Sequence, residues 1–281
     1  MTLKMHRDMV DGLERGKVAE LGMEDTLNFE CDDRCMGRCC NKIKILLDPW
    51  DVESMARHLG ITGKEFLETY CEVEEDPRSR WPYVKLYDAE NGPCAFMMEG
   101  GRCTVYPVRS RNCRTYPVGR AVRFNPDGSK EEKYFMAEKQ PFCFGHGASR
   151  AWTLRQWLED AGSIDYYDLS DLYLELINYA TGVLQCGRWM NSRTARMILP
   201  FLYGPEVLRA KMGITGEEVD HREFYKRRME AIKVLLTELA AGFGFGPNVR
   251  DGGGEVEDVS VMDKVREILE PFTVFKIEGK R

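Results

Sequence analysis

The sequence predicts an α+β fold: a small Cys-rich metal-binding domain with a short antiparallel sheet, followed by a mostly α-helical C-terminal region. Three observations lead to this class. Cysteines concentrate near the start of the chain, with four of the ten inside residues 31–40. Short alternating segments separated by glycine turns occupy residues 81–138. From Thr153 onward, apolar residues recur at helical spacing.

The length and net charge of the chain limit its possible domain organisation and partners. The 281 residues suffice for one large or two modest domains. We expect an N-terminal arm over residues 1–26, the Cys-rich metal-binding domain over 27–162 and the helical region over 163–281. The net charge of −6 disfavours nucleic acid or an anionic membrane as the main partner. A protein partner or substrate stays open, and the sequence does not predict the oligomeric state.

The N-terminus carries charged residues throughout Met1–Met23 and lacks the apolar stretch of a signal peptide. No window approaches the roughly 20 apolar residues of a membrane span. We therefore expect a cytoplasmic protein, in which thiols stay reduced. Clustered cysteines in that setting indicate metal or redox chemistry rather than disulfides.

The predicted elements follow in chain order. Asp48-Pro49 begins a helix that runs to about His58 and ends at Gly60, and Thr62 caps a second one to about Cys71. Strand segments follow, with turns between them at Asn91-Gly92, Gly100-Gly101 and residues 125–128; the last turn would pair Ala121–Phe124 with Lys133–Met136.

The C-terminal half contains three helical patterns. The first, Tyr166–Leu184, presents one apolar face made of Leu169, Leu172, Leu176, Ala180 and Val183. The second, Glu217–Ala241, ends at the glycines of Gly242–Pro247. We interpret these glycines as a helix stop, because a nucleotide loop would follow a strand. A final helix covers about Val261–Leu269, after a glycine linker at 252–254.

The first cysteine group has the spacing Cys31-x-x-x-Cys35-x-x-x-Cys39-Cys40. On a helix, the first three would share a face. Gly37 makes an irregular loop an equal alternative. Side chains of adjacent residues usually diverge, so one metal ion would not easily take both Cys39 and Cys40. The pair therefore indicates two metals or a multinuclear cluster.

The second group is spread over a longer segment and consists of Cys94, Cys103, Cys113 and Cys143. The alternative interpretation is that these thiols are buried core residues, as free cysteines often are. Charged neighbours such as Asp32 and Arg34 make the first group a poor hydrophobic core. Cys71 and Cys186, among apolar neighbours, are expected to be core residues on helices.

The segment from Cys103 to Pro117, Cys-Thr-Val-Tyr-Pro-Val-Arg-Ser-Arg-Asn-Cys-Arg-Thr-Tyr-Pro, makes the sequence recognisable. With the Cys31–Cys40 opening and a last cysteine before a glycine turn, it resembles the CxxCxxCC cysteine-cluster family, described as a zinc- or iron-chelating domain. The resemblance covers about residues 28–162. Two positions depart from the family pattern: the opening spacings are three residues rather than two, and Ser110 replaces a proline.

The resemblance implies a set of eight metal ligands, and members are often labelled iron–sulfur-cluster-containing proteins. The family positions fall on Cys31, Cys35, Cys39, Cys40, Cys94, Cys103, Cys113 and Cys143. Eight thiols divide into two sets of four, and four thiolates satisfy either zinc or an iron–sulfur cluster. Unequal spacings and adjacent cysteines favour an iron–sulfur cluster or a multinuclear site over zinc.

Other residues near the cysteines have two interpretations each. Arg109, Arg111 and Arg114 either offset the charge of a thiolate-rich site, binding an anionic cofactor or substrate, or are solvated loop residues. His146 either replaces one thiolate or is a turn residue. Met97 and Met98 fit a strand core better than a ligand set.

Three functions from different classes remain. The leading one is a metal-binding protein that holds an iron–sulfur cluster or zinc through the eight cysteines. The second, a protein (flagellin) lysine N-methylase, rests on the family label alone, since no S-adenosylmethionine loop is recognisable and no catalytic residue is predicted. The third is a metal-stabilised interaction module whose helical half binds a partner.

Overall fold

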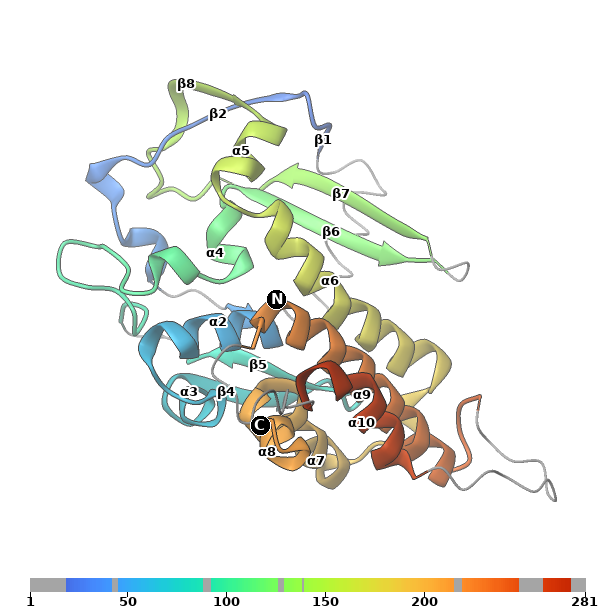
Figure 1. The fold of residues 1–281 in the computed structure, drawn as a ribbon. Coiled ribbons are helices and arrows are strands. Elements are labelled where there is room, and N and C mark those ends of the chain that lie inside the picture. Colours follow the sequence, from blue (N-terminus) through green and yellow to red (C-terminus); the bar gives the residue numbers. More distant parts are fainter. Residues whose placement is uncertain are drawn as a thin grey trace, which may run out of the picture. The chain divides into compact units, whose positions relative to one another are not determined.

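The computed structural model describes residues 19–41, 45–87, 92–125, 129–137, 139–214, 219–247 and 260–273 (Figure 1). The chain divides into two compact units. The first comprises Met1–Ile61, Phe66–Glu74 and Tyr83–Asp168, and the second Thr62–Glu65, Glu75–Pro82 and Leu169–Arg281. Small antiparallel sheets lie in the N-terminal half and helices dominate the C-terminal half, so the predicted α+β class is confirmed.

Short strands form three small antiparallel sheets within the described residues. The first has the order β1–β7–β6, and the second pairs β2 with β8. The third has the order β3–β5–β4. The strands are β1 (Glu20–Leu21), β2 (Thr26–Phe29), β3 (Leu46–Leu47), β4 (Cys71–Glu75), β5 (Pro82–Leu86), β6 (Val118–Phe124), β7 (Lys130–Met136) and β8 (His146–Thr153). The predicted hairpin across residues 125–128 is present, but its register differs from the prediction: β7 begins at Lys130, which lies opposite Phe124, so only Ala121 and Lys133 of the predicted segments face each other.

The helices of the N-terminal half are short and begin at polar caps. In α2 (Pro49–Leu59), Asp48 and Asp51 form a reciprocal capping box, and Gly60 ends the helix at φ 70°, as predicted. Helix α3 (Gly63–Tyr70) follows Thr62, whose hydroxyl accepts from Glu65 N. Helices α4 (Arg111–Thr115) and α5 (Leu154–Asp160) complete this set.

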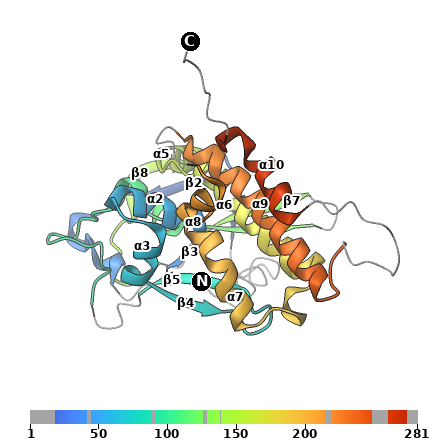
Figure 2. The same ribbon diagram turned by 60° about the horizontal axis from the view of Figure 1, so that its bottom comes forward.

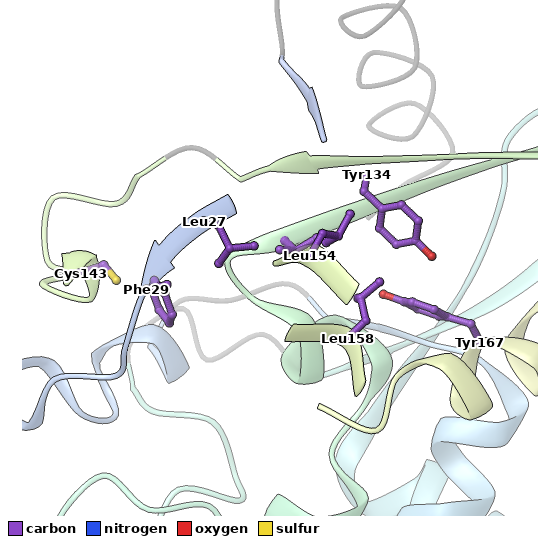
Figure 3. Packing of buried hydrophobic residues seen from close by; sticks show 8 residues of the cluster. Leu27, Phe29, Tyr134, Cys143, Leu154, Leu158 and Tyr167 are labelled. Atoms are coloured by element: carbon purple, nitrogen blue, oxygen red, sulfur yellow. The ribbon is translucent and has the colours of Figure 1, made fainter. Parts of the chain in front are cut away.

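The core of the first unit joins β2, the β6–β7 hairpin and α5. Its buried members are Leu27, Phe29, Val118, Tyr134, Cys143, Leu154, Leu158 and Tyr167. Figure 3 shows Cys143 beside Phe29 at one end of the cluster. This core holds β2 in place, and the first cysteine follows two residues after that strand.

The second unit is helical. It contains most of α6 (Ile164–Asn178) and the helices α7 (Ser192–Tyr203), α8 (Pro205–Met212), α9 (His221–Gly242) and α10 (Val261–Thr273). Helices α9 and α10 lie side by side (Figure 2) around a core that includes Leu208, Phe224 and Leu269. No helix among the described residues is long and apolar enough to cross a membrane.

Two predictions about individual residues need correction. Cys71 begins β4 and Cys186 begins a short 3₁₀ turn, so neither lies on an α-helix, although both are buried as expected. Val183 was expected on the buried face of α6 but is 50% exposed. The chain widens into a π-helical turn over Tyr179–Val183, and the extra residue rotates Val183 off that face. The predicted turns at Asn91 and at 252–254 lie outside the described residues.

Candidate metal centre

The Cys31–Cys40 segment is an irregular loop rather than a helix. It contains two 3₁₀ turns, Asp33–Cys35 and Arg38–Cys40. Gly37 separates them at φ 79°, a conformation that glycine adopts without steric cost. The loop alternative is thus confirmed, and Cys39 and Cys40 occupy consecutive positions of one 3₁₀ turn.

This loop packs against the segment that carries Cys94 and Cys103. The amide of Cys94 donates to the carbonyl of Cys40 at 2.8 Å. A Cβ atom placed on Gly37 would lie 2.6 Å from the Cα of Gly101, so the two backbones touch. The predicted turn at Gly100-Gly101 is present, with Met97 bridged to Cys103 across it. Two cysteine segments far apart in sequence therefore lie together (Figure 1).

Strand pairing brings the last cysteine to the first. Phe29 of β2 lies opposite His146 of β8, and Glu30 N donates to the carbonyl of Gly145 at 3.2 Å. A Cβ on Gly145 would lie 2.5 Å from the Glu30 oxygen, so only glycine permits this approach. The next residue after Glu30 is Cys31, and Cys143 precedes Gly145 by two positions.

Helix α4 carries Cys113 and is anchored to the N-terminus of α2. Asp51 is fully buried, and its Oδ1 accepts from Arg111 N at 2.9 Å and from the Tyr166 hydroxyl at 2.6 Å. Arg111 also pairs with the buried Asp48 at 3.2 Å. Sequence reasoning missed Asp51; its position three residues after the Asp48 N-cap was the available indication.

The thiols of the first group influence one another. Desolvation raises the pKa of Cys31, and repulsion from Cys39, Cys35 and Cys143 adds to this rise. The Cys40 thiol donates a hydrogen bond to Cys39, which lowers the pKa of Cys39 to about 6 and raises that of Cys40. Charges on Cys113 and Cys94 raise the pKa of Cys40 further.

Thiols of the second cysteine group also have raised pKa values. Desolvation raises the pKa values of Cys94 and Cys103, and for Cys103 repulsion from Cys94 contributes. Cys113 keeps exposed surface, but protein surrounds its thiol closely enough for desolvation to raise its pKa to about 11. Electrostatic influence therefore connects all eight predicted ligands, directly or through a shared neighbour. Within the described part of the chain, no three His, Cys, Asp or Glu side chains are already at metal-binding spacing.

A scan against known families identifies this region. Residues 30–143, which hold all eight candidate ligands, match the family model CxxCxxCC, described as "Putative zinc- or iron-chelating domain". The resemblance of this segment to the CxxCxxCC family is therefore confirmed. No curated protein and no solved structure matches the chain. The flagellin methylase label gains no support from these comparisons and stays a prediction.

Two hydroxyl groups of the CxxCxxCC domain face thiols, and sequence reasoning missed both. Desolvation raises the pKa of Tyr116, and a hydrogen bond donated to Cys143 raises it further. Ser110 is buried, and among the described residues its Oγ meets no good hydrogen-bond geometry, yet it lowers the pKa of Cys113. A thiolate at Cys113 would give Ser110 a stronger acceptor, so these residues fit a thiolate-binding metal.

The three predicted arginines have different surroundings. Arg109 lies over the Tyr106 ring at 3.9 Å and lowers the pKa of Cys31 and Cys103. Arg111 pairs with Asp48, and Arg114 donates to the carbonyl of Ala161 at 3.0 Å. Their proposed contact with an anionic cofactor stays a prediction, but Arg109 is the one of the three whose charge acts on the thiols.

His146 lies at the edge of the first cysteine group. Its Nε2 is 3.4 Å from the Tyr116 hydroxyl, and its ring packs edge-on against Phe29. Desolvation lowers its pKa. His146 thus shares Tyr116 with Cys143, which suits a neighbour of the site rather than a replacement for a thiolate.

Proposed function

We propose that the CxxCxxCC domain holds iron, as iron–sulfur clusters, through the thiolates of its eight cysteines. Zinc is the alternative that the same ligands would accept. The proposal is supported by backbone contacts that bring the segment of Cys40 to that of Cys94 and the segment of Cys31 to that of Cys143. Their adjacent and unequally spaced members favour an iron–sulfur cluster over a zinc ribbon, in which paired Cys-x-x-Cys spacing is usual.

The donor set supports thiolate chemistry. Among the described residues of this region, the thiols influence one another, and Arg109 and Arg34 are cations that interact with them. Raised pKa values at Cys31, Cys94, Cys103 and Cys113 mean that these thiols are protonated at neutral pH without metal. Metal binding must therefore release protons, and affinity must fall as pH falls.

We also propose a cytoplasmic location. Oxidation of Cys39, whose thiol pKa is lowered to about 6 and whose thiol partner is Cys40, would remove ligands from the site. A reducing compartment prevents that loss. Secretion in an oxidised, metal-free form would contradict this part of the proposal.

Metal analysis of anaerobically purified protein tests the function. We expect iron and acid-labile sulfide, with the visible charge-transfer absorption of an iron–sulfur cluster. Colourless protein with stoichiometric zinc and no iron would eliminate the cluster but retain chelation. Protein with neither metal after anaerobic reconstitution with iron and sulfide, or with zinc, would eliminate chelation itself.

A pair of variants separates ligand loss from damage to the fold. Cys113→Ala should lower both metal content and stability. Cys71→Ala removes a buried thiol outside the region, so it should lower stability while leaving metal content unchanged. Equal metal content in both variants would contradict the role of Cys113.

A further inference from the structure

We propose that the eight cysteines form two separate four-cysteine sites, with the division between the adjacent residues Cys39 and Cys40. Site one would consist of Cys31, Cys35, Cys39 and Cys143. Site two would consist of Cys40, Cys94, Cys103 and Cys113. This inference rests on the proposed function, since it assigns the number and membership of the sites.

The geometry of the Cys39–Cys40 pair is the first argument. Both residues lie in the 3₁₀ turn Arg38–Cys40, in which successive side chains project about 120° apart. The carbonyl of Cys40 accepts from Cys94 N at 2.8 Å, which fixes Cys40 beside the second segment. The backbone of Cys40 is thus fixed at the second segment, while its thiol hydrogen-bonds to that of Cys39, so the two proposed sites would adjoin at this pair.

Site one is assembled by strand pairing. The Glu30–Gly145 hydrogen bond and the Phe29–His146 pairing bring Cys31 to the segment of Cys143. Cys35 is held in the preceding 3₁₀ turn, where its Sγ donates to the Asp32 carbonyl at 3.3 Å. The electrostatic influence of Cys39, Cys35 and Cys143 on Cys31 agrees with this placement.

Site two is assembled by a turn and a helix. Met97 N donates to the Cys94 carbonyl at 2.9 Å, and Met97 is bridged to Cys103, so that turn holds both cysteines. Helix α4 is fixed by Asp51 and by Asn112, whose side chain donates to the Leu46 carbonyl at 3.2 Å. The electrostatic influence of Cys113 and Cys94 on Cys40, and of Cys103 on Cys113, agrees with this placement.

Cys39 is where the sites meet, because it also interacts with Cys40 and Cys103. Each site additionally has one hydroxyl neighbour. Tyr116 donates to Cys143 of site one, and Ser110 lies at Cys113 of site two. Groups that hydrogen-bond a ligand typically change metal affinity by roughly 10- to 100-fold. Removing one of these hydroxyls should therefore change the metal affinity of one site and not of the other.

Metal stoichiometry in the full-length chain tests the number of sites. Cys35→Ser and Cys103→Ser change one cysteine in each site, and neither side chain is fully buried. We expect each variant to lose about half of the bound metal and the double variant to lose nearly all of it. Complete loss in either single variant would show one shared site and overturn the proposal.

A second experiment tests the membership of Cys39 and Cys40. The probe is zinc, titrated against a competing chelator into anaerobic, metal-free protein. In a Cys40→Ser background, Tyr116→Phe should weaken the remaining site by roughly 10-fold. In a Cys39→Ser background, the same change should have no effect. The reverse pattern would overturn the division.

Failure of the proposed function and failure of the two-site assignment would give different results. Wild-type protein that binds no metal would defeat the proposed function before any variant is compared. Wild-type protein that binds metal but loses all of it in either single variant would retain the function and defeat the two-site assignment. Far-UV circular dichroism of each variant identifies unfolding, and Cys71→Ala serves as the cysteine replacement outside both sites.

Discussion

Asp51 links the capping of a helix to the position of a candidate ligand. Its carboxylate closes the capping box of α2 and accepts from the backbone of Arg111 and from Tyr166. Desolvation raises its pKa to about 7, with repulsion from Asp48 as the next cause. The ordinary pKa of this group is 3.8, so the folded chain holds a proton that the unfolded chain releases.

This difference predicts a pH dependence. Between pH 3.8 and about 7, the folded state binds more protons at Asp51, so its contribution to the free energy of unfolding falls as pH rises. Each pKa unit corresponds to about 1.4 kcal/mol, which makes the total a few kcal/mol. Asp51→Asn should flatten the stability of metal-free, reduced protein over this window.

Urea denaturation at pH 5 and pH 8 checks the prediction. The difference between the two values should shrink in Asp51→Asn, although the lost acceptor lowers stability overall by about 1 kcal/mol. Asp168→Asn, which changes an exposed carboxylate of the same unit, serves as the control and should leave the difference unchanged. Identical pH profiles in wild type and Asp51→Asn would contradict the assignment.

Residue types and spacing carried the ligand prediction but not the groups around the ligands. The eight cysteines are recognisable from sequence because their chemistry is distinctive. Ser110 looked like a neutral replacement for proline, and Tyr116 looked like part of a motif. Their importance depends on which thiol each hydroxyl reaches, and that depends on backbone geometry which single-residue patterns do not encode.

At the scale of elements, two loops are brought together by paired glycines. Gly37 and Gly101 both have positive φ angles, and a Cβ on Gly101 would lie 2.6 Å from the carbonyl oxygen of Met36. Gly100 has a similar φ of +83°, but no atom lies within 4 Å of its Cβ position. The adjacent glycines therefore share a left-handed backbone conformation and differ in packing.

Gly101→Ala should consequently reduce metal retention more than Gly100→Ala. Either change costs about 1–2 kcal/mol for a left-handed alanine. Only Gly101→Ala also separates the Cys31–Cys40 loop from the Cys94–Cys103 turn. Metal content after dialysis against a chelator measures the difference. Equal retention in the two variants would show that contact between these loops is not needed for binding.

A second glycine pair, Gly145 and Gly147, tests the contact between the Cys31 segment and the Cys143 segment. Gly145→Ala would force apart the Glu30 and Gly145 backbones, whereas Gly147, at φ +79°, has open space around its Cβ position. On the two-site assignment, Gly145→Ala should lose about half of the metal and Gly147→Ala very little. Metal analysis with a Cys35→Ser comparison checks this, since adding Gly145→Ala to Cys35→Ser should remove no further metal.

Elements formed by local sequence were predictable, and those formed by distant pairing were not. Helix α2, with its Asp48 cap and Gly60 stop, and the β6–β7 hairpin depend on residues close in sequence. The pairing of β2 with β8 joins residues more than 100 positions apart, such as Leu27 and Trp152. Its strand is only four residues long, too short for periodicity to reveal.

At the scale of the whole molecule, all eight candidate ligands lie in the first compact unit. The second unit has its own core, with Leu208, Phe224 and Leu269 among its buried members. Metal bound to folded but not to unfolded protein stabilises whatever region forms the site. Its contribution should therefore concentrate in the first unit, while the core of the second depends on apolar packing.

Removing the metal should consequently loosen the two units unequally. At a free-metal concentration of 100 Kd, binding adds about 2.7 kcal/mol to the free energy of opening the site. Amide exchange through that opening is then roughly 100-fold slower than in metal-free protein. Hydrogen exchange followed by mass spectrometry, with and without chelator, should show faster exchange in residues 31–41, 92–116 and 143–147. Helix α9 should keep its protection. Equal acceleration in α9 would show that the metal stabilises the chain as one cooperative unit, because exchange would then report global rather than local opening.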